Sequence, residues 1–225
     1  YLSTELNSFL DDVEIYTKAV NDTISRINAE FPDFKDSSFV KSGEADILVN
    51  IQNLKEGAVA AYDNFTMTEN RAQLRALSDS IRASIGTLFE SVLNAQVNLN
   101  DYDSLSNKIA IAEKRYSDAI AKIDTSYVNI KDLDIFVKAE KDIIDSLNVL
   151  RDRMKTSFEK GNMAGDMSKL EGTCDDVNAA ITKLLEDMRK YYAKVRIQYA
   201  LVKTQIAAVS KLYDDALANI NSEYT

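Results

Sequence analysis

Three segments of the chain carry an apolar stripe whose members are spaced by steps of three and four residues. Such spacing lines up apolar side chains on one face of an α-helix that packs along antiparallel neighbours. We name these stripes in chain order. The first comprises Leu6, Phe9, Val13, Tyr16, Val20, Ile24, Ile27 and Phe31; the second comprises Tyr102, Leu105, Ile109, Ala112, Tyr116, Ile120, Ile123 and Tyr127; the third comprises Tyr199, Val202, Ile206, Val209, Tyr213, Leu217, Ile220 and Tyr224. The pattern predicts an all-α fold.

The stripes belong to a longer internal repeat with a spacing of 96 to 97 residues. Residues 113–127 match residues 210–224 at 7 of 15 positions. Residues 78–90 align with 174–186, and Phe39–Lys41 recurs as Phe136–Lys138. Because the matches cover three helical segments, we predict tandem antiparallel three-helix bundles in an elongated arrangement.

Turn-forming residues are scarce, with 6 glycines and 1 proline in 225 residues. All-β and α/β folds need many Gly-, Asn- or Pro-rich connections, so the composition favours long helices with few corners. The sequence predicts about seven helices, with breaks at Phe31–Asp33, Asn64–Thr68, Asn98–Asp103, Lys160–Gly165 and Val195–Tyr199, and one more before a helix that begins around Asp132 or Asp134. The last break contains no Gly, Pro or Asn, and one continuous rod is the alternative there.

The repeat predicts a division of the chain into three parts. Residues 1–31 form the closing helix of a preceding or partial unit, residues 32–127 a first three-helix unit, and residues 128–225 a second one. Since the chain begins at Tyr1 and in mid-unit, we expect a piece of a longer protein. Neighbouring repeats of the same chain are then expected partners of each unit.

Few catalytic chemistries are open to this composition, because the chain has no histidine and a single cysteine, Cys174. Histidine-based acid–base catalysis, catalytic triads and almost every zinc or iron–sulfur site are thereby excluded. No glycine-rich loop that could cradle phosphate is present. Cys174 aligns with Ser78, which indicates an inert packing position. We predict a chain that is not an enzyme, with no catalytic, metal or cofactor-binding residues.

One local cluster departs from the acidic background of the chain, whose net charge is −9. It comprises Arg189, Lys190, Tyr191, Tyr192, Lys194 and Arg196. Arg and Tyr are enriched at protein interfaces, so these residues form our candidate partner-binding patch for an acidic protein or a glycan. The alternative interpretation is a basic face that balances Glu186 and Asp187, with the tyrosines in the core between helices.

The charge and hydropathy also limit the partners. A net charge of −9 disfavours nucleic acid and anionic membrane surfaces, and no apolar run is long enough for membrane insertion. We therefore expect a non-enzymatic structural or adhesive module, cell-surface or secreted, that serves as a spacer or binds protein or cell-surface glycan. The alternative is an intracellular helical scaffold that binds protein partners in the cytoplasm.

Overall fold

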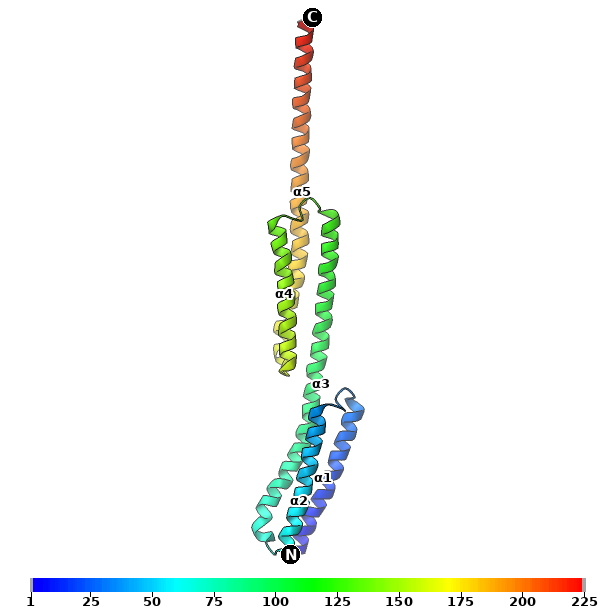
Figure 1. Ribbon diagram of the computed structural model, residues 1–225, viewed down its shortest axis with the longest axis vertical. Coiled ribbons are helices and arrows are strands. Elements are labelled where there is room, and N and C mark those ends of the chain that lie inside the picture. Colours follow the sequence, from blue (N-terminus) through cyan, green and yellow to red (C-terminus); the bar gives the residue numbers. More distant parts are fainter. Residues whose placement is uncertain (1, 224–225) are drawn as a thin grey trace. The chain divides into compact units, whose positions relative to one another are not determined.

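The computed structural model describes residues 2–223, and those residues form five α-helices and their connections (Figure 1). The helices are α1 Leu2–Glu30, α2 Ser38–Asp63, α3 Met67–Ser126, α4 Asp134–Glu159 and α5 Met163–Glu223. The prediction of an all-α fold is confirmed. The predicted number of about seven helices is wrong for the described residues.

Four predicted breaks are confirmed, including the one before α4, which begins at Asp134. Pro32 follows the end of α1, where its ring and missing N–H prevent another helical turn. Between α2 and α3, Phe65 adopts a positive φ of 59°. Gly161, with a φ of 66°, separates α4 from α5 in a conformation that costs glycine little.

The predicted turn at Asn98–Asp103 is absent, because α3 runs through it without interruption. This stretch has no Gly or Pro, and Asn or Asp inside a helix costs only a few tenths of a kcal/mol, about 0.7 at most. On the helix surface, the Gln96 side-chain amide donates to Asn100 Oδ1 at 2.8 Å. Asp103 is therefore an interior helical residue and not a cap.

The predicted turn at Val195–Tyr199 is also absent, since α5 is one helix of 61 residues. The rod that we considered as the alternative is the observed structure. A change of repeat spacing from 96 to 97 residues is absorbed inside the helix, where one extra residue rotates the following side chains by about 100°. A shift in the repeat therefore does not require a turn.

The chain divides into two compact units, Tyr1–Asn100 and Asp101–Thr225. In the first unit, α1, α2 and the first half of α3 surround one apolar core. Its fully buried members include Ile27 from α1, Leu54 from α2, and Met67 and Ile81 from α3. Each of these helices thus contributes one apolar face to the core.

The second unit builds its core in the same way, from the second half of α3, α4 and the first part of α5. Its fully buried members include Leu105 and Ile123 from α3, Leu150 from α4, and Met163 and Ile181 from α5. The sequence units 32–127 and 128–225 start one helix later than these compact units. The predicted closing helix, residues 1–31, belongs to the first compact unit.

Buried positions in the two units correspond at a spacing of 96 residues along α2 and α4. Val40 corresponds to Phe136, and Leu54 corresponds to Leu150, all of them buried. The Phe39–Lys41 match predicted a spacing of 97 here and is out of register by one residue. Phe39 is exposed whereas Phe136 is buried, because a one-residue shift turns a side chain to another face of the helix.

One polar contact in the first core is replaced by an apolar pair in the second. The buried hydroxyls of Tyr16 and Ser78 are hydrogen-bonded at 2.8 Å, and Ser78 also donates to Asp12 Oδ2 at 2.9 Å. At a spacing of 96, Ala112 and the buried Cys174 take the places of Tyr16 and Ser78. A buried hydroxyl needs a hydrogen-bond partner, and the second core contains neither the tyrosine hydroxyl nor the serine hydroxyl at these positions.

Candidate functional site

The six residues of the candidate partner-binding patch all lie on α5, but they point in several directions around it. Successive residues of an α-helix are rotated by about 100°, so a contiguous run cannot form one face. Tyr192 points to the core and makes an edge-on contact with Tyr127, with ring centroids 5.6 Å apart. Tyr191 contacts Phe136 of α4 in the same manner at 5.8 Å.

The basic members of the patch are exposed and are divided between faces. Lys190 lies 3.8 Å from Glu186, one turn earlier, in an exposed pair of the kind that contributes little to stability. Arg189 lines a groove of about 390 Å³ between α3 and α5, together with Arg115 and Lys122 of α3. Lys194 and Arg196 are exposed further along α5. The structure brings Arg189 close to basic residues from another helix and does not gather the six into one surface.

A larger groove, of about 680 Å³, lies between α4 and α5. Its floor is apolar and includes Ile143, Val177 and Leu184, while Phe136 and Tyr191 line it as well. Charged side chains also line it: Asp142 from α4, with Asp176, Lys183 and Asp187 from α5. An apolar floor with a few polar groups is the usual build of a binding groove. Of the predicted patch residues, only Tyr191 lines it.

The first unit has the same groove at equivalent positions, between α2 and α3, with a volume of about 400 Å³. Asp46, Ile47 and Leu88 stand where the second unit has Asp142, Ile143 and Leu184. The lining of α3 carries Ser80, Thr87 and Ser91 in place of the charged residues of α5. The repeat thus preserves the groove while changing its charge.

Sequence reasoning missed these grooves, although small residues at facing positions were a signal. Gly43 and Ala139 occupy equivalent positions on α2 and α4, and Ser84 and Ala180 do so on α3 and α5. Small side chains leave space between two helices, although at Gly43 the Leu88 side chain fills it, since a Cβ there would lie 2.8 Å from Leu88 Cδ1. The same residues also fit helix surfaces, so only the packing distinguishes the two cases.

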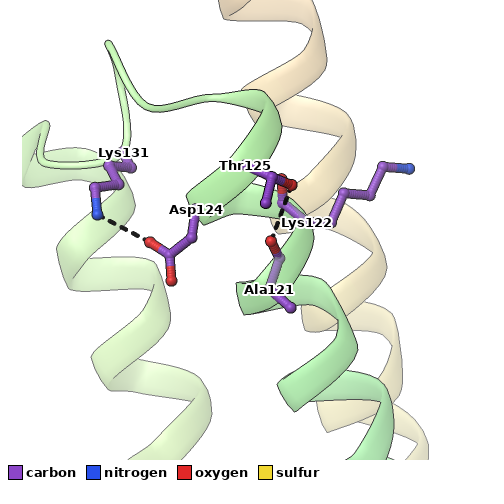
Figure 2. Close-up of polar contacts among 5 residues, drawn as sticks. All are labelled: Ala121, Lys122, Asp124, Thr125 and Lys131. Carbon is purple, nitrogen blue, oxygen red and sulfur yellow. Dashed lines mark hydrogen bonds and ion pairs between the residues drawn. The ribbon is translucent and has the colours of Figure 1, made fainter.

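A polar cluster joins the end of α3 to the connection before α4 (Figure 2). The Lys131 ammonium donates to Asp124 Oδ1 at 2.9 Å, and Thr125 donates to the carbonyl of Ala121 at 3.1 Å. Burial, and next the nearby charge of Asp124, raise the pKa of Glu140 above its usual value. The ion pair ties the connection to α3, which is a structural role.

Cys174 is a buried core residue on α5. Burial, and next the charge of Asp175, raise the pKa of its thiol, so the nucleophilic thiolate is disfavoured. The thiol accepts only a long contact of 3.9 Å from the Asn178 amide. These surroundings favour the predicted packing role over a reactive one.

Across residues 2–223, no helix combines the length and apolar character that a membrane span requires. Within the same range, no three His, Cys, Asp or Glu side chains are grouped so that they could hold a metal ion. No protein-family model matches the chain, and neither the curated proteins nor the solved structures include a significant match.

Proposed function

We propose that the chain is a non-enzymatic structural module of tandem three-helix repeats that acts as a spacer and presents helix faces to a protein or glycan partner. One observation carries the proposal: equivalent positions are buried in both units, helix by helix, at a constant spacing. Met67 and Met163, Leu88 and Leu184, and Val92 and Met188 illustrate this for α3 and α5. A core that recurs at equivalent positions is typical of repeat proteins, in which the number of repeats determines the length of the protein.

The length of the individual helices supports the spacer role. At 1.5 Å per residue, α3 with 60 residues and α5 with 61 residues each extend about 90 Å. A helix of this length is stiffer than a flexible segment of the same number of residues. Repeat size then determines the separation that the module sets.

The surface grooves support a binding role alongside spacing. Hollows between two helices recur at equivalent positions, and the one between α4 and α5 combines an apolar floor with Asp142, Asp176 and Asp187. Such a surface suits a protein partner with basic and apolar side chains. We assign the module to the cell surface or the extracellular space; an intracellular scaffold with protein partners is the alternative, and it would use the same grooves.

Small-angle X-ray scattering, with the molecular mass determined in the same experiment, tests the spacer proposal. A compact domain of 225 residues would have a radius of gyration of roughly 17 Å. We expect a value well above this and a rod-like decay at monomeric mass. A radius of gyration near 17 Å for a monomer would refute the spacer role.

A further inference from the structure

The third apolar stripe lies on the C-terminal half of α5 and is exposed along its described length. Exposed fractions are 69% for Tyr199, 62% for Ile206, 65% for Val209 and 65% for Tyr213. Ile220 at 54% is exposed as well, and Tyr224, the last member of the stripe, lies outside the described residues. From Tyr199 to Ile220 the stripe runs for about 33 Å, far longer than the scattered apolar residues of an ordinary surface.

The two equivalent stripes are buried, and in each case two helices cover them. The first stripe packs against α2 and α3, with its members Phe9 and Tyr16 in the core. The second stripe, on α3, packs against α4 and α5 in the same way. Polar contacts mark both flanks of this second interface: Glu113 pairs with Arg151 of α4, and Lys108 pairs with Glu171 of α5.

We propose that the third stripe binds an antiparallel helical hairpin of the repeat's own type, built like α4 and the first part of α5. This inference rests on the repeat organisation in the proposed function and identifies the kind of partner that the module takes at α5. It continues an interface that the chain already makes twice. A second copy of the chain fits less well, because its hairpins already cover its own two buried stripes and it could offer only one free helix.

The flanks of the third stripe define the chemistry of the hairpin. At a spacing of 97 residues, Gln205, Ser210 and Leu212 replace Lys108, Glu113 and Arg115. Each of these three charges is thereby replaced by a neutral or apolar side chain. The hairpin should then lack the acid and the base that correspond to Glu171 and Arg151.

Leu212 makes the difference sharpest. Its counterpart Arg115 donates to Thr182 Oγ1 at 3.3 Å and to Asn178, both on α5. Leu212 offers no donor and is 69% exposed, so the hairpin positions facing it should be apolar. The third interface is accordingly more apolar than the second.

The test extends the full chain after residue 224, because Tyr224 corresponds to Tyr127. The extension is a second copy of residues 128–195 that carries Arg151→Gln, Glu171→Gln, Asn178→Leu and Thr182→Val, so that it meets Gln205, Ser210 and Leu212 without unmatched charges. Backbone amide exchange is then compared for residues 199–220 with and without the extension. We expect a monomer in which these amides exchange at least about 100-fold more slowly than in the 225-residue chain. Unchanged exchange in the extended chain would overturn the inference.

Two matched variants of the extended chain locate the contact. Ile206→Asp, on the stripe, should abolish the protection, whereas Lys211→Asp, on the opposite face of α5, should retain it. If both variants retain the protection, the hairpin binds elsewhere and the inference fails. A 225-residue chain that dimerises through residues 199–220, and an extended chain that remains dimeric, would identify a second copy as the occupant and would also overturn it.

Failure here is distinguishable from failure of the proposed function. Exchange in the two buried cores is recorded in the same experiment and reports on the repeat directly. Protected cores with unprotected residues 199–220 would refute only the hairpin. A compact scattering profile would refute the spacer role whatever the state of α5.

Discussion

Equivalent leucines in the two cores give a quantitative test of the repeat. Leu54 on α2 and Leu150 on α4 are 96 residues apart, and each side chain is 0% exposed. Replacing a fully buried leucine by alanine removes apolar contacts and leaves a cavity, which costs about 2–5 kcal/mol. We expect Leu54→Ala and Leu150→Ala each to lower the local free energy of unfolding by about 3 kcal/mol.

Native-state hydrogen exchange is the appropriate assay, because a chain of two units is not expected to unfold as one two-state system. Leu54→Ala should reduce protection in α1, α2 and the first half of α3, and Leu150→Ala should reduce it in the second unit. Val49→Ala and Val149→Ala, at sites that are 58% and 45% exposed on the same helices, serve as controls with changes within about 0.5 kcal/mol. The structural equivalence of the units would be refuted if one leucine variant lost less than about 1 kcal/mol of local free energy of unfolding and the other lost about 3 kcal/mol.

Three further predictions follow from single residues. Gly161→Ala should destabilise the chain by about 1 kcal/mol, because Gly161 has a positive φ. Gly172→Ala should stabilise it by up to about 1 kcal/mol, because Gly172 lies inside α5 with open space around it. Urea unfolding measures both changes. Folding raises the pKa of the Cys174 thiol, so the thiol of the unfolded chain loses its proton at lower pH. The free energy of unfolding of the second unit should therefore fall as pH rises above about 8.5. A Cys174→Ser variant whose free energy of unfolding falls equally with pH would contradict this. Because α3 is continuous, Asp101→Pro should lower the free energy of unfolding by about 3 kcal/mol, with Asp101→Ala as the control. A proline variant as stable as the alanine variant would show that a turn, and not a helix, is present at residue 101.

Sequence patterns predicted the helices and the breaks that depend on backbone chemistry. Pro32 and Gly161 ended helices because a ring or a positive φ is incompatible with continued helix. The stretch Asn98–Asp103 has only weak preferences against helix, and these were outweighed by continuation of the chain on either side. Asn alone does not decide the matter, since Asn64 follows the end of α2 whereas Asn98 and Asn100 lie inside α3.

Identity of residues proved a weaker guide to register than periodicity of burial. The triplet at Phe39 and that at Phe136 are identical, yet the buried members are Val40 and Phe136. Three matching residues carry no information about which face is buried, whereas a stripe over seven turns does. The candidate patch failed to gather on one surface for the same reason, because Arg189 to Arg196 spans more than two turns of α5.

The third stripe shows where sequence periodicity reaches its limit. The second and third stripes share the same order of aromatic and apolar aliphatic residues, yet Ile123 is 1% exposed and its counterpart Ile220 is 54% exposed. Helix formation depends on local preference, whereas burial depends on the helices that lie alongside, so similar stripes can form a core or a surface. The second and third stripes differ in the residues beside them. Lys108 and Arg115, beside the second stripe, pair with polar residues of α5. Their counterparts Gln205 and Leu212 carry no charge. The third stripe thus keeps its apolar residues while the charges beside it are replaced. We expect this combination in a helix face that packs against a different hairpin.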